Sequence, residues 1–127
     1  MMIDIGANLT HDSFDADRDE VIQAARAAGV ETFIITGSDV SCSTKARDLA
    51  HQYGDCYATA GIHPHHAGDF DGESQAALLS LLSDDKVVAV GETGLDYFYS
   101  PESKEVQLTS FVDHIKVANE TKKPLII

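Results

Sequence analysis

Five short apolar runs, separated by helical patterns, constrain the fold of this chain more than any other feature. Most of them are continuous stretches of Val, Ile, Phe and Ala without a polar alternation, which is typical of strands buried on both faces of a parallel sheet. The runs occupy residues 2–7, 31–36, 56–62, 86–90 and 124–127. With helices between them, they predict a parallel α/β sheet built from repeated strand–helix units.

Three helices are expected between the first four runs. The first begins after Asp17, which has Glu20 three residues on in the manner of a capping box, and it ends at Gly29. The second begins at about Ser41 and places an apolar face toward the sheet. The third is rich in Leu and spans about 74–82.

A fourth helix is expected before the last apolar run. Ser100 is placed to cap it and Pro101 to occupy its first turn, while Lys122 and Lys123 suit its C-terminal end. Its apolar stripe, which we expect to face the core, consists of Leu108, Phe111, Val112 and Ile115.

This order of elements fits both a doubly wound open sheet and half of a (β/α)8 barrel. The chain stops on an apolar strand at 127 residues, which is half of the ~250 residues that such barrels usually have. We therefore predict the N-terminal half of a (β/α)8 TIM-type barrel. Residues 1–127 would form one partial domain, truncated after its fifth strand.

Composition limits the classes of function. The 21 Asp and Glu residues outnumber the 9 Lys and Arg residues and give a formal net charge of −12, which excludes a basic DNA-docking surface of the usual kind. Bound divalent cations could still supply the positive charge that a phosphoesterase needs. The two cysteines fit no disulfide framework, and no signal peptide or membrane-length apolar run is present, so a cytoplasmic protein without a stable protein partner is expected.

Polar clusters follow the C-terminal ends of the first four predicted strands, which meet on one rim in a parallel barrel. The sharpest case is Glu92, which directly follows the apolar run 87–91. A carboxylate there is costly unless it is paired or bound to a metal. We predict that Glu92 is a metal ligand and catalytic residue, with Mg²⁺ preferred and Mn²⁺ or Zn²⁺ as alternatives.

Histidines form a second cluster on the same rim. His63 and His65 flank Pro64, and both could face one site. Neutral imidazoles there could bind a metal ion, and N–H donors or protonated rings could hold phosphate oxygens. His66 is expected to face solvent. The remaining histidines are read as structural: His11, His51 and His114.

Two further polar residues remain open in role. Asn8 follows the first predicted strand and is only a possible polar contact. Asp96 lies four residues beyond Glu92, where it could position a substrate or cap a turn beside Gly94.

Three motifs together resemble the TatD family of metal-dependent hydrolases, which belong to the amidohydrolase-like barrels. They are Asp-Ile-Gly-Ala-Asn-Leu-Thr at 4–10, Thr-Ala-Gly-Ile-His-Pro-His at 59–65, and Ala-Val-Gly-Glu-Thr-Gly-Leu-Asp-Tyr at 89–97. The resemblance implies a hydrolase that cleaves DNA phosphodiester bonds with divalent metal ions, of the 3′-5′ exonuclease type.

The resemblance also assigns residues. Glu92 matches the glutamate that binds metal after the fourth strand, and His63 and His65 match the Gly-x-His-Pro-His motif on the substrate side. Many members carry His-x-His after the first strand, where this chain has Asn8 and Thr10. The other ligands of the family are a His after the fifth strand, a His after the sixth and an Asp after the eighth.

Two alternatives stay open. The first is an amidohydrolase or ester hydrolase that acts on a small molecule with a similar barrel. The second is an inactive, truncated βα fragment. In the nuclease interpretation too, we expect residues 1–127 alone to have little or no activity.

Overall fold

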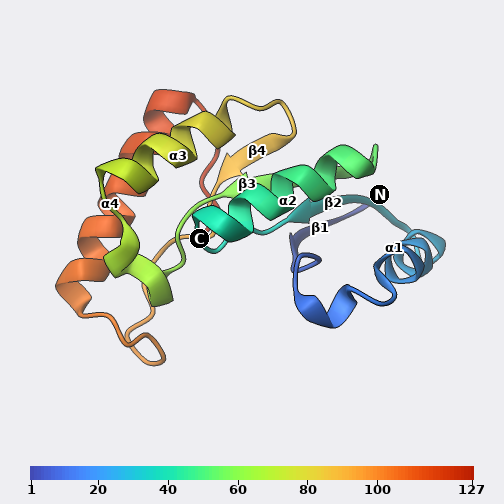
Figure 1. The fold of residues 1–127 in the computed structure, drawn as a ribbon, viewed down its shortest axis with the longest axis horizontal. Helices are drawn as coiled ribbons and strands as arrows, with labels where there is room; N and C mark the ends of the chain where they lie inside the picture. The colour runs from blue at the N-terminus through green and yellow to red at the C-terminus, as the bar shows by residue number, and fades with distance from the viewer.

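The computed structural model describes all residues from 1 to 127 and contains a parallel four-stranded sheet (Figure 1). Its strands are β1 (Met2–Ala7), β2 (Val30–Ile35), β3 (Cys56–Ala60) and β4 (Val87–Val90). The α-helices are α1 (Arg18–Ala27), α2 (Val40–Gln52), α3 (Gly72–Leu82) and α4 (Lys104–Thr121). Two short 3₁₀ helices, η1 (Asp12–Phe14) and η2 (Pro64–Asp69), follow β1 and β3.

The order of strands in the sheet is the order in the chain, β1-β2-β3-β4, with every pair parallel. A doubly wound sheet requires a reversal of strand order, and this sheet has none. Because crossovers between parallel strands are right-handed, sequential order places successive helices on the same side of the sheet. This is the arrangement of a (β/α)8 barrel, and the predicted half-barrel is confirmed.

The fifth predicted strand is only partly formed. Residues 124–127 lie beside β4, where Leu125 makes a single parallel bridge to Val90. The Val90 N–H donates to the carbonyl of Pro124, and the Ile126 N–H donates to the carbonyl of Val90. The segment has no strand on its other side, so it lacks the second ladder that would hold it extended.

The prediction that the strands are buried on both faces holds for β3 and fails for β1. Four of the five residues of β3 are fully buried, whereas only Ala7 is buried in β1. Met2, Ile3 and Ile5 are exposed because β1 lies at the edge of the sheet, where only β2 makes extensive contact with it.

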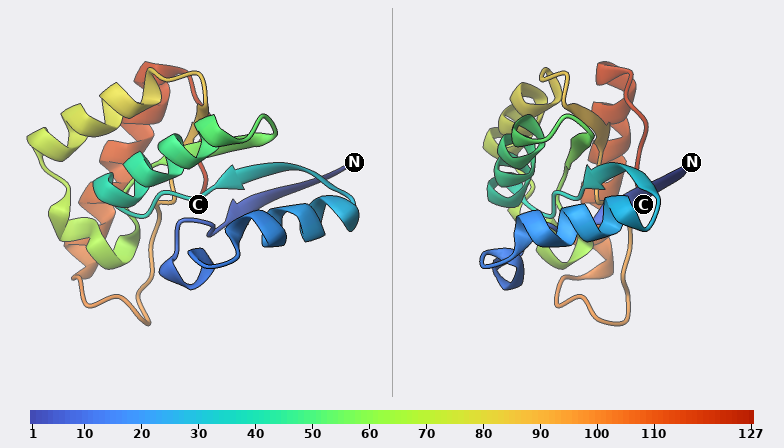
Figure 2. Two further views of the ribbon diagram at one scale, coloured as in Figure 1. Left: turned by 45° about the vertical axis from the view of Figure 1, so that its right-hand side comes forward. Right: turned by 90° about the vertical axis from the view of Figure 1, so that its right-hand side faces the viewer.

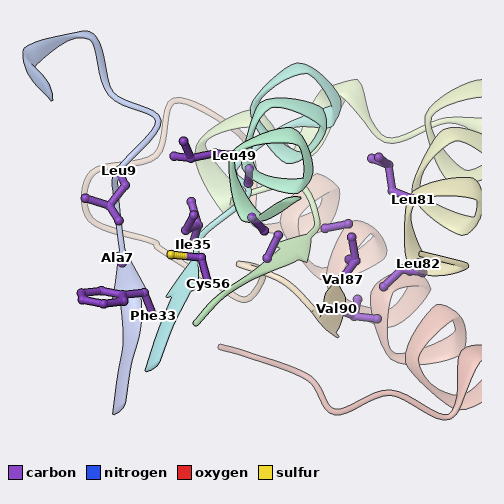
Figure 3. Close-up of a cluster of buried hydrophobic side chains, with 14 of the residues drawn as sticks. Ala7, Leu9, Phe33, Ile35, Leu49, Cys56, Leu81, Leu82, Val87 and Val90 are labelled. Atoms are coloured by element: carbon purple, nitrogen blue, oxygen red, sulfur yellow. The ribbon is translucent and has the colours of Figure 1, made fainter. Parts of the chain in front are cut away.

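The hydrophobic core lies between the sheet and the helices. Figure 3 shows Leu49 of α2 and Leu81 and Leu82 of α3 among side chains of the strands. The strand residues that they join include Ile35, Cys56, Val87 and Val90. None of the helices combines the length and the apolar character that a membrane crossing requires.

Two predicted helix starts differ from the structure. Asp17 precedes α1, but its side chain makes no capping hydrogen bond, so the predicted capping box is wrong. The helix does end as predicted, before Gly29 at a φ of 100°. Helix α4 begins at Lys104 with Ser103 as its cap, so Pro101 lies before the helix and not in its first turn. The Ser100 hydroxyl accepts from the Glu102 N–H at 3.1 Å and donates to the carbonyl of Pro64 at 2.9 Å, in the turn that precedes the helix.

The buried face of α4 is also not the predicted one. Leu108, Val112 and Ile115 of the apolar stripe are exposed and Phe111 is half-buried. The helix instead buries Gln107, Ser110, His114 and Val117. Two of these polar side chains face inward because each bonds to a loop at the edge of the sheet: Gln107 accepts from the N–H of Asp96 and His114 accepts from that of Ile62.

The cap of α4 gives a first prediction. Ser103→Ala removes the hydroxyl that accepts from the Val106 N–H, so we expect the free energy of unfolding to fall by about 1 kcal/mol. Urea denaturation followed by circular dichroism measures this loss. Ser80→Ala is the matched control, since Ser80 is exposed within α3 and Ala is the better helix former. Equal losses in both variants would contradict the cap.

Candidate active site

Three loops at the C-terminal edge of the sheet are joined by backbone hydrogen bonds. The Glu92 N–H after β4 donates to the carbonyl of Gly37 after β2, at 2.8 Å. The His63 N–H after β3 donates to the carbonyl of Ser38, also at 2.8 Å. The polar clusters that the sequence placed on one rim are therefore held together by the main chain.

The close approach of these loops depends on glycine. A Cβ atom added at Gly61 would lie 2.6 Å from the carbonyl carbon of Gly91, and one added at Gly91 would lie 2.5 Å from the carbonyl oxygen of Ile126. Gly91 also has a φ of 147°, which side chains rarely allow. Only glycine lets the loop carrying His63 touch the loop carrying Glu92.

Glu92 lies at the mouth of the barrel half, on a cavity of about 430 Å³. Asn8, Thr36 and Ser38 contribute polar groups to the same cavity. No Lys or Arg lies within 4.0 Å of the carboxylate, and the one basic side chain at that distance is His63, whose Nε2 is 4.0 Å from Oε1. A solvent-reachable carboxylate without a cationic partner is a natural cation ligand.

His63 is held as a hydrogen-bond donor toward Glu92. Its Nδ1 accepts from the backbone N–H of His65 at 3.0 Å, so in the neutral ring Nε2 carries the proton. Burial lowers the pKa of His63, against an opposing effect of Glu92. The Nε2–H of this ring is thus available to an oxygen atom that enters the space beside Glu92.

His65 pairs with Asp96. Its Nε2 lies 2.7 Å from Oδ2 of Asp96, and its ring lies edge-on to that of His63 with centroids 4.4 Å apart. The backbone N–H of Tyr99, followed by His65, lowers the pKa of Asp96. Asp96 therefore closes the turn that follows Gly94 and also fixes the ring of His65.

The side chains of the other sequence candidates make no hydrogen bond to Glu92, His63 or His65. Asn8 lines the cavity of Glu92. The Thr10 hydroxyl lies 3.5 Å from Sγ of Cys42. His66 is exposed as predicted, and His51 is paired on the surface with Asp84.

The side chains that face the cavity could supply part of the ligands of a metal site. No group of three or more His, Cys, Asp or Glu side chains is gathered anywhere in residues 1–127. Glu92 is the carboxylate that faces the cavity, and His63 offers it an N–H rather than a lone pair. These residues could hold an ion from one side and would need further ligands on the other.

Sequence reasoning assigned His114 a structural role but missed how closely it supports the site. The side chain is fully buried, Nε2 accepts from the Ile62 N–H at 2.9 Å, and Nδ1 lies 2.7 Å from the carbonyl of Ser110. The imidazole is thereby fixed as the Nδ1–H tautomer. Its partner Ile62 directly precedes His63 in the chain. A signal was available, because Gln107, Ser110 and His114 recur at helical spacing as a polar stripe.

His114 gives a second prediction. His114→Leu leaves the Ile62 N–H buried without an acceptor, so we expect a loss of about 1–3 kcal/mol in the free energy of unfolding. His114→Gln can accept from Ile62 and donate to Ser110, so it should retain most of that stability. Urea denaturation of the three proteins tests this, and equal losses in both variants would contradict the role of the hydrogen bonds.

The free energy of unfolding should also depend on pH through His114. Burial holds the pKa of His114 below its ordinary value of 6.5, so the unfolded chain binds a proton more readily than the folded one. Stability contributed by the neutral ring should be complete above pH 6.5 and decline as the pH falls toward the lower folded-state value. His114→Gln should lack this part of the decline, and an unchanged pH profile would contradict it.

Comparison with known proteins identifies a family. The family model described as TatD related DNase matches residues 3–127. A protein of Cronobacter turicensis named 3′-5′ ssDNA/RNA exonuclease TatD is 40% identical over 126 residues, which are 99% of this chain and 48% of that protein. The protein of the same name from Escherichia coli K12 is 38% identical over the same shares.

Solved structures share the fold. A crystal structure of a TatD homologue from Escherichia coli K12 matches with a TM-score of 0.89 and 29% identity, over 98% of this chain and 49% of that one. A TatD family hydrolase from Entamoeba histolytica matches with a TM-score of 0.83 and 31% identity, over 94% and 46%. The chain spans about half the length of the relatives it matches. With nearly every residue inside the family model, the chain belongs to the TatD-related DNase family.

Proposed function

We propose that residues 1–127 are the N-terminal half of the domain of a metal-dependent hydrolase that removes nucleotides from the 3′ end of DNA. The observation that carries the proposal is the carboxylate of Glu92, which faces a cavity without a cationic partner and has the Nε2–H of His63 beside it. Membership of the family and the printed name of the relatives, 3′-5′ ssDNA/RNA exonuclease, support this substrate class.

Glu92 would hold the metal ion from the β4 side of the rim. A bound divalent cation supplies Lewis-acid charge and an activated water for phosphodiester hydrolysis. Mg²⁺ is the ion we propose, because a carboxylate ligand with room for water suits it, with Mn²⁺ and Zn²⁺ as the alternatives. The acidic chain would then approach a phosphate through the bound cation rather than through a basic surface.

His63 and His65 would orient the substrate. The Nε2–H of His63 donates toward the space beside Glu92, where a phosphate oxygen could accept it. His65 is fixed by the carboxylate of Asp96, which keeps its ring against that of His63. Asn8 and Ser38 offer neutral polar contacts across the same cavity. The two histidine rings are positioned by hydrogen bonds within the rim before a substrate binds, which lowers the cost of ordering the site.

A labelled single-stranded oligonucleotide tests the proposal. The protein that carries the complete domain should shorten a 5′-labelled strand stepwise from its 3′ end with Mg²⁺ or Mn²⁺, and EDTA should stop the reaction. Residues 1–127 alone should leave the strand intact, since they gather no three-ligand site. Faster turnover of a panel of small esters and amides, with no attack on the strand, would favour the small-molecule hydrolase instead.

A further inference from the structure

The only exposed aromatic side chains of the protein are three consecutive residues beside the candidate site. The chain has nine Phe and Tyr residues, and the exposed ones are Tyr97, Phe98 and Tyr99. Phe98 is 84% exposed and Tyr99 is 76% exposed. Figure 2 shows the segment between β4 and α4, which carries them, projecting beyond the helices and the sheet. Large exposed rings gathered in one place point to a ligand.

The loop that carries these rings is held firmly. Oδ1 of Asp96 accepts from the backbone N–H groups of Phe98 and Tyr99 at 3.1 and 2.9 Å. The Asp96 N–H donates to Oε1 of the buried Gln107 at 2.7 Å. The rings of Phe98 and Tyr99 also pack edge to face, with centroids 4.6 Å apart. The loop that carries the aromatic surface is therefore held in place within residues 1–127, where the rings face solvent.

The same contacts connect the rings to the candidate site. Asp96, which fixes the loop, is also the partner of His65, and His65 packs on His63 beside Glu92. A strand whose phosphate lies between His63 and Glu92 would have its neighbouring nucleotides close to this loop. One ring already has a cationic partner, since the ammonium of Lys104 lies 4.9 Å from the centroid of Tyr97.

The net charge of the chain limits the kinds of contact by which this surface could bind a nucleic acid. A chain with a net charge of −12 cannot hold a polyanion by a basic groove, so affinity must come from bound cations and from contacts that are not ionic. Aromatic rings stack on the bases of single-stranded nucleic acid without regard to sequence. Bases in a duplex are stacked on one another and cannot reach an exposed ring.

We propose that Phe98 and Tyr99 form a stacking platform for unpaired bases of a single-stranded nucleic acid substrate. The proposal rests on the proposed nuclease function, and it assigns the preference for single strands to this loop. Phe98 and Tyr99 set the affinity for bases, whereas Glu92 and the histidines handle the phosphate. The platform would thus act on KM more than on kcat.

The first test compares strands with and without bases in the protein that carries the complete domain. Phe98→Ala/Tyr99→Ala should raise KM for oligothymidylate about tenfold or more and leave kcat within about twofold. For an abasic oligomer of the same length and charge, the KM of the double variant should equal that of the unmodified protein. Leu108→Ala, which removes an exposed apolar side chain on α4, is the control, and it should change the KM for neither substrate.

The second test separates stacking from hydrolysis. Residues 1–127 contain no Trp, so Phe98→Trp adds a fluorescent reporter to this half of the domain that can still stack, and its signal is read against that of the unmodified protein. With EDTA present, oligothymidylate should quench its emission and the abasic oligomer should not. Phe98→Leu, which keeps apolar area without the π face, should weaken binding as Ala does.

The outcomes distinguish the two proposals. Quenching by oligothymidylate without any hydrolysis would retain the platform and overturn the nuclease function. Hydrolysis with an unchanged KM in the double variant, or an equal loss on the abasic oligomer, would overturn the platform alone. A change of solution mass in the double variant, with an unchanged KM, would show that the rings cover another copy of the chain instead.

Discussion

In the protein that carries the complete domain, Glu92→Gln should reduce hydrolysis of a single-stranded oligonucleotide by at least about 100-fold. Loss of groups that merely support a ligand already costs about 10- to 100-fold in affinity or activity, and Glu92 is proposed as the ligand itself. Glutamine keeps nearly the same volume, so packing around the half-exposed side chain should hold. The loss should be largest at limiting Mg²⁺ or Mn²⁺, where the missing charge weakens occupancy.

Two controls show whether the loss of activity comes from the site and not from misfolding. Circular dichroism and the urea midpoint of Glu92→Gln should match those of the unmodified protein, because the carboxylate has no Lys or Arg partner to lose. Glu120→Gln, on the exposed side of α4, makes the same chemical change away from the cavity and should retain full activity. Turnover close to that of the unmodified protein in Glu92→Gln would mean that this residue is structural.

Gly61→Ala should have the largest effect on folding. The added methyl group would lie 2.6–2.7 Å from three backbone atoms of Gly91, and a backbone cannot rotate aside as a flexible side chain does. Overpacking in a closed region costs about 1–3 kcal/mol and more where the backbone must move, so we expect about 3 kcal/mol or more. The movement would also separate the loop of His63 from that of Glu92, so activity should fall even where the variant folds.

Urea denaturation measures the loss, and Gly72→Ala is the matched control. A Cβ atom at Gly72 meets nothing within 4 Å, and the residue begins α3, where Ala suits a helix at least as well as Gly. Gly72→Ala should therefore be neutral or slightly stabilising. If Gly61→Ala proved as stable as Gly72→Ala, the loops of His63 and Glu92 would not need to touch, and their contact would not be required to form the site.

Local sequence was sufficient for much of this protein. Continuous apolar runs have few ways to be buried, so they determined the four strands of the sheet to within about two residues at each end. Gly29 ended α1 because its φ of 100° is open to glycine. The positions of Glu92, His63 and His65 at strand ends followed from the rule that parallel strands present their C-terminal ends on one edge.

Tertiary structure alone decided which face of α4 is buried, where that helix begins and how the histidines are held. A hydrophobic stripe of Leu108, Val112 and Ile115 predicts burial only if something covers it. Instead, His114 turned inward to accept from the N–H of Ile62, 52 positions away, and Gln107 to accept from that of Asp96 in the loop before the helix. An unmet buried N–H costs about as much as a lost apolar contact, so such bonds can outweigh the stripe. Pairings such as His65 with Asp96 join residues 31 positions apart, and no local pattern encodes a contact that the sheet creates.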